Sequence, residues 1–251
     1  MAHTDIKWRT PWRRAQVVAL LSAIAIVTTA CPSPDLPRSA TDRKGRDDPA
    51  PPTGPTGIVD YAPGLRIDYR RPRVEVDAEV ILREADLELF AYSRAPTPKE
   101  HETILRTDVS ATRIYEALGL IGLAPGHTMK YFPETKTVRM PEGDPVDVLV
   151  RYLRDGKTVE SSACDWMWDV AADRPMGYTP WLFTGSQRME DGAFYADYEG
   201  TIVTVVDFPS SLLSLPVSHS SSDDALWLRA NTAAIPPIGT KVTMILRPAA
   251  P

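Results

Sequence analysis

Cysteine and histidine are both scarce in this sequence. Its 251 residues include only two cysteines, Cys31 and Cys164, and four histidines. Two thiols cannot build an iron–sulfur cluster, an all-cysteine zinc site or a framework of disulfides. A glycine-rich phosphate loop, a calcium loop and the Gly-x-Ser-x-Gly pattern of hydrolase nucleophiles are also missing. We therefore expect no cofactor and find no complete catalytic signature.

A hydrophobic run of transmembrane length is missing as well. The uncharged stretch "AQVVALLSAIAIVTTA" covers residues 15–30, which is short for the ~20 residues of a stable membrane span. A basic segment with Lys7, Arg9, Arg13 and Arg14 precedes it. This order is typical of a signal peptide, so residues 1–30 are assigned to one. The residues after Arg13-Arg14 do not support twin-arginine export.

The apolar run ends in "VTTAC", with Cys31 directly after Ala30. Small residues before a cysteine at this place resemble the bacterial lipobox, in which the peptide is cut before the cysteine and its thiol is acylated. Thr28 departs from the usual leucine of that motif. We predict Cys31 as the lipidation site; an ordinary signal peptide or an uncleaved anchor is the alternative. With Cys31 acylated, Cys164 lacks a partner and is expected to be buried.

A tether is predicted between this anchor and the rest of the chain. Residues 32–57, "PSPDLPRSATDRKGRDDPAPPTGPTG", contain seven prolines and almost no large apolar side chains. Such a segment cannot bury enough surface to offset the entropy of ordering. Residues 31–57 are therefore predicted to be the lipidated cysteine and a disordered, extended tether. The protein is then expected to be exported and membrane-anchored on the periplasmic side of the cell envelope.

Positive charge is also in deficit. The chain has 28 Lys and Arg against 33 Asp and Glu; residues 1–30 hold four basic and one acidic side chain, which leaves 24 against 32, or −8, in the mature part. Nucleic-acid binding needs a basic footprint, so nucleic acid is excluded as a partner. Broad electrostatic adhesion to anionic lipid is disfavoured for the same reason.

Alternating apolar residues predict a strand-rich domain over residues 58–251. The segment 65–80 predicts a hairpin broken at Arg71-Pro72, and 87–93 a third strand. Asp155-Gly156 separates two alternating runs and is the strongest short hairpin signal in the chain. The last strands are expected in "FYADYEGTIVTVVDF", which predicts two, and in "KVTMILRP".

Two helices complete the prediction. One covers residues 110–120, where Ile114, Tyr115 and Leu118 share a face. The other begins near Ser222, with Asp223 and Asp224 at its start and a stripe formed by Leu226, Ala230 and Ala233. Runs of strands with few helices indicate a single α+β domain with mainly antiparallel sheet.

The segment "KEHETIL" places His101 between two carboxylates. A zincin would need a second histidine at position 105, which is Leu105, so that motif fails. A metal site formed by His101, His127 and a carboxylate such as Asp165 is one hypothesis. Acid–base catalysis by His101 and Glu102 is another. A polar connection with a structural or recognition role is the third, and is favoured.

Tryptophans supply the other binding candidates. On a strand, Trp166 and Trp168 of "CDWMWDV" would share one face beside Asp165 and Asp169. Exposed indoles of this kind can stack on a sugar or a peptide aromatic, whereas buried ones pack the core. Burial is favoured for at least one of them, and Trp181 is open to the same two interpretations.

Residues 58–251 resemble the YdjY-domain proteins, in particular planctomycete-type lipoproteins. The resemblance lies in "VEVDAEVILREADLELFAYS", "KEHETIL", "ALGLIGLAPGH", "PWLFTGS", "ADYEGTIVTVVDFPSSLLSLP" and "PPIGTKVTMILRP". It covers nearly the whole predicted domain and implies no activity, because the family has no settled one. The positions that match its motifs are Lys99, His101, Glu102, Gly126, Trp181, Gly185, Ser186, Asp197, Gly200, Phe208 and Pro209.

Two functions follow from these observations. The first is a non-enzymatic, lipid-anchored binding or envelope-organising module that contacts an envelope protein or glycan. Its candidate contact residues are Lys99, His101, Glu102, Trp166, Trp168 and Trp181. The alternative is a metal-assisted or acid–base hydrolase of an envelope polymer, with His101 and Glu102 as catalytic candidates. The first is favoured, so the chain is not expected to be an enzyme.

Overall fold

The computed structural model describes residues 57–96, 99–219 and 226–250. The predicted leader, Cys31 and the tether up to residue 56 lie outside the described residues. The described residues belong to one compact unit. Among the described residues, no helix combines the length and the apolar character needed to cross a bilayer.

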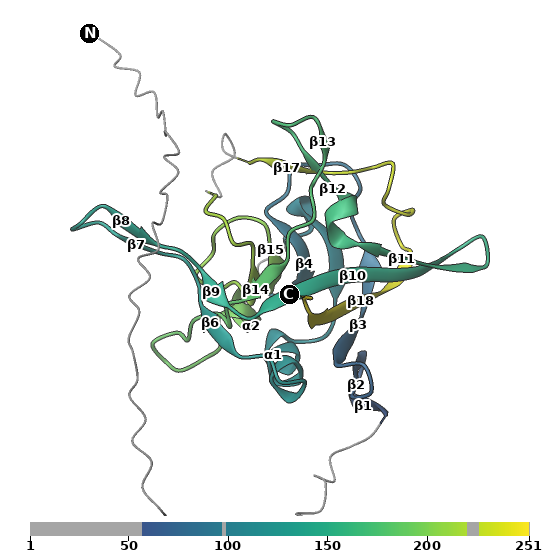
Figure 1. Ribbon diagram of the computed structural model, residues 1–251, viewed down its shortest axis with the longest axis horizontal. Helices are drawn as coiled ribbons and strands as arrows, with labels where there is room; N and C mark the ends of the chain where they lie inside the picture. The colour runs from purple at the N-terminus through teal and green to yellow at the C-terminus, as the bar shows by residue number, and fades with distance from the viewer. Residues whose placement is uncertain (1–56, 97–98, 220–225, 251) are drawn as a thin grey trace, which may run out of the picture. The chain divides into compact units, whose positions relative to one another are not determined.

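Eight strands of the described chain close into a barrel (Figure 1). They are β3 (Arg73–Val80), β4 (Leu89–Ser93), β5 (Thr103–Thr107), β10 (Pro145–Arg154), β14 (Trp181–Phe183), β15 (Thr201–Thr204), β16 (Leu213–Ser214) and β18 (Lys241–Pro248). Around the ring their order is β3, β18, β10, β14, β16, β15, β4 and β5, and β5 pairs back to β3. Only the β15–β16 and β4–β5 pairs are parallel. The expected mainly antiparallel, strand-dominated architecture is confirmed in this form.

Further strands extend or flank the barrel. β1 (Ile58–Ala62) and β2 (Leu65–Asp68) continue the sheet beside β3, and β11 (Lys157–Ser162) pairs with β10. A separate small sheet consists of β12 (Met167–Asp169), β13 (Arg174–Pro175) and β17 (Leu228–Ala230).

A two-stranded arm, residues 125–143, projects from the barrel (Figure 1). Its base is the pair β6 (Pro125–His127) and β9 (Glu142–Gly143), and its outer part is the pair β7 (Lys130–Phe132) and β8 (Thr137–Arg139). Tyr131 and Val138 lie opposite each other on the outer pair, and about half of each side chain is exposed.

Both predicted hairpins are present. β2 pairs with β3 across the Arg71-Pro72 break, and β10 pairs with β11 across Asp155-Gly156. Asp155 and Gly156 both have positive φ, 52° and 73°, which suits the tight right-twisted turn of a two-residue hairpin. Alternation along β3 buries Val74, Val76, Ala78 and Val80 inside the barrel.

Only one of the two predicted helices is found where it was expected. α1 (Ala111–Leu120) begins after Ser110, whose hydroxyl accepts a hydrogen bond from the Arg113 amide, and it buries Ile114 and Leu118. The second α-helix of the described chain is α2 (Tyr195–Glu199), in a segment predicted to be a strand. A helix is favoured there because the Ser186 hydroxyl accepts from the Ala196 amide and Gly200 closes the helix with positive φ.

The helix predicted from Ser222 onward is wrong for its C-terminal half. Leu228–Ala230 is strand β17, paired with β12 through Met167 and Ala230. Strand alternation buries Leu228 and Ala230 instead, whereas Ala233 of the predicted helical stripe is exposed. Its expected caps, Ser222 to Asp224, lie outside the described residues.

Aromatic side chains fill the core between the barrel and the small sheet. The ring of Phe90 lies 6.1 Å from that of Trp166 and 6.4 Å from that of Trp181. The Trp181 indole donates a 3.0 Å hydrogen bond to the carbonyl of Thr204, so its one polar atom is satisfied. Both tryptophans are about 1% exposed.

Candidate functional site

The "KEHE" segment lies in the short crossover that joins the parallel strands β4 and β5. Residues Glu100–Glu102 form the 3₁₀ turn η1, and Lys99 directly precedes it. Because β4 and β5 are neighbours, this turn lies beside the start of β4, and the Glu88 amide donates to the carbonyl of Glu102. Glu88 thereby joins a segment that is distant from it in sequence.

Glu88, Lys99 and Glu102 form a cluster of three partly buried charges. The Lys99 ammonium donates to Glu102 Oε1 at 2.9 Å and lies 3.5 Å from Glu88 Oε2. The side chains of Lys99, Glu88 and Glu102 are only 13%, 11% and 15% exposed. Withdrawing three charged groups from water costs free energy, which is offset only where they pair well. We call these three residues the acid–lysine cluster.

The pKa of one carboxyl in this cluster, that of Glu88, is raised close to neutral pH. Burial raises the pKa of Glu88 to about 7, and the hydrogen bond and the charge of Glu102 add to that rise, while Lys99 opposes it. Burial alone would lower the pKa of Lys99, but the Glu102 and Glu88 carboxylates outweigh it and raise that pKa. The lysine therefore stays charged, whereas Glu88 can gain or lose a proton when the pH changes around neutrality.

An aromatic ring completes the cluster. The Lys99 ammonium lies 4.9 Å from the centre of the Phe208 ring, within the range of a cation–π contact. Phe208 also lines a hollow of about 340 Å³ between the arm and the barrel. Its remaining walls are Met129, Lys130, Tyr131, Gln187, Asp207 and Pro209. This volume is at the lower end of the range for small-molecule pockets.

His101 is the most accessible part of the motif. Its side chain is 78% exposed, and its Nε2 lies 3.5 Å from Glu102 Oε2. Glu100 faces away from the cluster and accepts hydrogen bonds from Arg106 at 2.7 Å and Tyr92 at 3.0 Å. In this segment, Glu102 belongs to the acid–lysine cluster, Glu100 bonds to neighbouring residues of the fold, and His101 is exposed to solvent.

The predicted metal set of His101, His127 and Asp165 does not converge. No three His, Cys, Asp or Glu side chains of the described chain are arranged to hold a metal ion. His127 lies on the arm, where its Nε2 is 3.2 Å from Glu142. Asp165 accepts from the Ser162 amide in a capping box at the start of the 3₁₀ turn η2 (Ala163–Trp166). Local capping explains Asp165 in full.

That turn also corrects the interpretation of the tryptophan pair. Trp166 ends η2 and Trp168 lies in β12, so the two indoles do not share a strand face. Burial is confirmed for Trp166, which is in the core, whereas Trp168 is half-buried. Trp181 is in the core as well. Among these three candidates, Trp168 alone is partly accessible to a partner.

Several other residues that the resemblance implicates have structural explanations. Asp197 accepts hydrogen bonds from the amide and the hydroxyl of Thr112, at 3.0 and 2.5 Å, and so ties α2 to the first turn of α1. A Cβ at Gly200 would lie 2.3 Å from the carbonyl oxygen of Ser93, so only glycine fits there. Lys99, Glu102 and Phe208 have no such explanation, because their interactions are mainly with one another.

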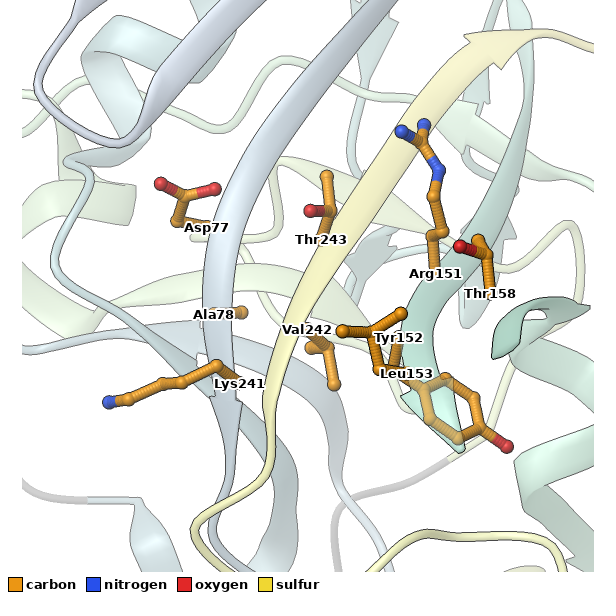
Figure 2. A pocket seen from close by; sticks show the side chains of 9 residues that line it. All are labelled: Asp77, Ala78, Arg151, Tyr152, Leu153, Thr158, Lys241, Val242 and Thr243. Carbon is orange, nitrogen blue, oxygen red and sulfur yellow. The ribbon is translucent and has the colours of Figure 1, made fainter. Parts of the chain in front are cut away.

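A second hollow of about 420 Å³ lies on the outside of the barrel (Figure 2). Asp77, Thr243 and Arg151 come from the adjacent strands β3, β18 and β10. Asp77 pairs with Arg66 at 2.7 Å, and Arg151 pairs with Glu75 at 2.7 Å. Its charges are thus already matched within the fold, which makes this hollow a weaker candidate than the acid–lysine cluster.

The fold and this cluster define a small, mainly antiparallel barrel domain with a charged crossover between two parallel strands. The YdjY domain model matches residues 65–247, so the chain belongs to the YdjY-domain family. The match includes Glu88, Lys99 and Glu102 of the acid–lysine cluster and all barrel strands except the last residue of β18. No curated protein and no solved structure matches the chain.

Sequence reasoning found Lys99 and Glu102 but missed Glu88. Glu88 lies in the strand-like run "LELF", in which alternation predicts that an acidic residue faces solvent. Its role depends on the parallel β4–β5 pairing, which no local pattern reveals. Phe208 carried a signal only through the family resemblance.

Proposed function

We propose that this protein is a lipid-anchored, extracytoplasmic binding module of the cell envelope, acylated at Cys31 and held by the tether of residues 32–57. The acid–lysine cluster and its adjoining hollow form the contact site for an envelope protein or glycan. Support comes from three paired charges kept 11–15% exposed beside Phe208, an arrangement that the barrel itself does not require. A partner with hydroxyl or amide groups could exchange hydrogen bonds with these groups.

The anchor is tested by feeding cells radiolabelled palmitate. The native chain should incorporate label, and the Cys31→Ser chain should incorporate none and leave the membrane fraction. Equal labelling of both chains, or a mature N-terminus other than Cys31, would overturn the anchor.

The contact site is tested with the mature chain carrying Cys31→Ser and with washed envelope fragments in a sedimentation assay. Lys99→Met and Phe208→Ala should each weaken binding about tenfold, because each removes a central contact. Lys157→Met is the matched control, since Lys157 is exposed on β11. His101→Ala asks whether the exposed imidazole contributes. Equal binding by Lys99→Met and Lys157→Met would exclude the cluster as the site.

An acid–base hydrolase is the second candidate, favoured by the raised pKa of Glu88 beside Glu102. The Lys99 ammonium contacts both carboxyls, Glu102 Oε1 at 2.9 Å and Glu88 Oε2 at 3.5 Å. A carboxyl whose pKa is raised toward neutral pH by burial and by a neighbouring carboxylate can act as a general acid or base. Release of soluble fragments from purified envelope polymer, lost in Glu88→Gln and Glu102→Gln, would support hydrolysis; no release at any pH between 5 and 8 would exclude it.

A further inference from the structure

A third hollow is lined by three arginines among its six residues. It has a volume of about 470 Å³ and lies where the β2–β3 turn meets the C-terminal end of β18. We call it the arginine hollow; its lining residues are Arg71, Pro72, Arg73, Glu160, Arg247 and Pro248. Three guanidinium groups in one hollow stand out in a chain whose mature part carries a charge of −8.

Two of these arginines form ion pairs with buried carboxylates. Arg73 Nη2 lies 2.8 Å from Glu75 Oε1, and Arg247 donates through Nε and Nη2 to Asp147 Oδ2, both at 3.1 Å. The side chains of Glu75 and Asp147 are each only 7% exposed, whereas that of Arg247 is 48% exposed. The two carboxylates are therefore buried and Arg247 is presented to solvent, whereas Arg73 is only 19% exposed and also lies 3.6 Å from Asp68.

Both oxygens of the Asp147 carboxylate already accept hydrogen bonds within the fold. The Tyr178 hydroxyl donates to the second Asp147 oxygen at 2.6 Å, so both oxygens are engaged. Each guanidinium has five N–H donors, and these contacts use only the inner ones. The remaining donors of the half-exposed Arg247 are available, in an orientation that the ion pair with Asp147 fixes in advance.

Arg71 adds a charge without a partner. Its side chain is exposed and forms no ion pair with any residue that the structure describes. Arg73 contributes a buried Nε that has no hydrogen-bond acceptor in the described chain. The hollow thus contains unmatched donors, in contrast to the hollow of Figure 2, whose charges are paired.

We propose that the arginine hollow binds the phosphate group of a phosphate ester. Guanidinium forks bind phosphate oxygens in pairs, and a phosphate monoester carries about −1.5 to −2 charges at neutral pH, which suits three arginines. The hollow, about 470 Å³, exceeds the size of a bare phosphate, so it also has room for part of the ester's organic group beside the lining residues Pro72 and Pro248. This site is separate from the acid–lysine cluster and does not depend on the function proposed there.

Glu160 provides a test in which removing a charge should strengthen binding. This carboxylate lies in the lining, 41% exposed, and its Oε2 is 3.3 Å from Arg151 Nε. It would repel a bound phosphate, so Glu160→Gln should tighten binding several-fold, while Arg71→Gln should weaken it about tenfold or more. Both side chains are on the surface, and neither substitution removes a core contact.

The test uses the mature chain with Cys31→Ser and titration calorimetry at low salt. The probes are glycerol 3-phosphate, inorganic phosphate, and vesicles of phosphatidylglycerol or of phosphatidylcholine. Arg139→Gln on β8 is the matched control, because Arg139 is an exposed arginine away from the hollow. Saturable binding of the soluble phosphates, weakened by Arg71→Gln and not by Arg139→Gln, would identify a soluble phosphate ester as the ligand.

Binding to phosphatidylglycerol vesicles alone, with the same pattern among the variants, would identify a lipid headgroup as the source of the phosphate. The proposal is overturned if neither phosphate source binds, or if Arg139→Gln weakens binding as much as Arg71→Gln. It is also overturned if chloride at equal ionic strength competes as well as phosphate, since that would indicate unspecific charge attraction.

Discussion

Glu88 makes the stability of the barrel depend on pH in a particular direction. Its pKa is raised to about 7 in the fold, so the fold favours the protonated carboxyl. The stability this contributes is complete below the ordinary pKa near 4.5 and is lost as the pH rises through about 7. We expect a loss on the order of 1 kcal/mol, with solvent screening allowed for. Relative to Glu88→Gln, the melting temperature of the native chain should fall by about 2–4 °C between pH 5 and 8.

Glu100 provides a control of opposite sign. A hydrogen bond from Arg106, supported by one from Tyr92, lowers the pKa of Glu100. Its contribution is therefore present at neutral pH and lost on acidification below the ordinary pKa. Glu100→Gln should change the melting temperature relative to the native chain without adding any pH dependence between 5 and 8. If the melting temperatures of the native chain and of Glu88→Gln changed in parallel across that range, the raised pKa of Glu88 would be contradicted.

Cys164 is expected to be an inert thiol. It is 2% exposed, and burial raises its pKa, so little thiolate is present at neutral pH. In the Cys31→Ser chain, alkylation by iodoacetamide should be on the order of 100-fold slower in the native state than in urea, because reaction requires local opening. Mass spectrometry of the alkylated chain measures this directly. Rapid native labelling would show that the thiol is accessible.

At the scale of elements, Asp197 links the two α-helices. It accepts two hydrogen bonds from Thr112 in the first turn of α1, where a carboxylate also complements the helix dipole. Asp197→Ala should therefore lower the free energy of unfolding by about 2 kcal/mol, measured by urea denaturation. Glu199→Ala, on the same short helix, is the control and should change it little. If Asp197→Ala lost envelope binding at full stability, Asp197 would belong to the contact site instead.

Local sequence patterns predicted the elements whose partners are adjacent in the chain. The hairpins at 65–80 and 145–162 were found because alternation and turn residues both lie within a few positions. Residues 195–199 alternate like a strand yet form a helix, because Ser186 and Gly200 satisfy its ends from outside the pattern. Residues 228–230 show the reverse, since pairing with β12 overrides a helical stripe.

The candidate site likewise contains residues that local sequence predicts and residues that only the tertiary structure brings together. Lys99 and Glu102 were recognisable because they lie three residues apart in a polar segment. Glu88 and Phe208 join them only through the parallel β4–β5 pair and the path of the chain after β15. The arginine hollow likewise combines the β2–β3 turn with the end of β18, which are more than 170 positions apart in sequence. Proximity of this kind follows from barrel closure, which a single sequence does not encode locally.

At the scale of the whole molecule, we expect the closed ring of strands to make folding cooperative. β18 is the last strand in sequence, yet it lies between β3 and β10 and pairs with both. It buries Val242, Met244 and Leu246 in the barrel. Each such side chain contributes about 1.5–3 kcal/mol on burial, so the strand accounts for a large share of the ~5–15 kcal/mol typical of a domain. Without β18 the ring is open, and the edges of β3 and β10 are unpaired.

A chain ending at Gly239 should therefore lose cooperative unfolding and bind a hydrophobic dye, whereas one ending at Pro248 should unfold like the native chain. A chain that starts at residue 57 should also keep the native melting temperature, because the closed barrel and its core lie in the compact unit to which the described residues belong. Near- and far-ultraviolet circular dichroism, recorded together during thermal unfolding, measure this cooperativity. If the chain ending at Gly239 still melted in one sharp transition, β18 would be an accessory strand, and closure through β3 and β10 would not be what stabilises the fold.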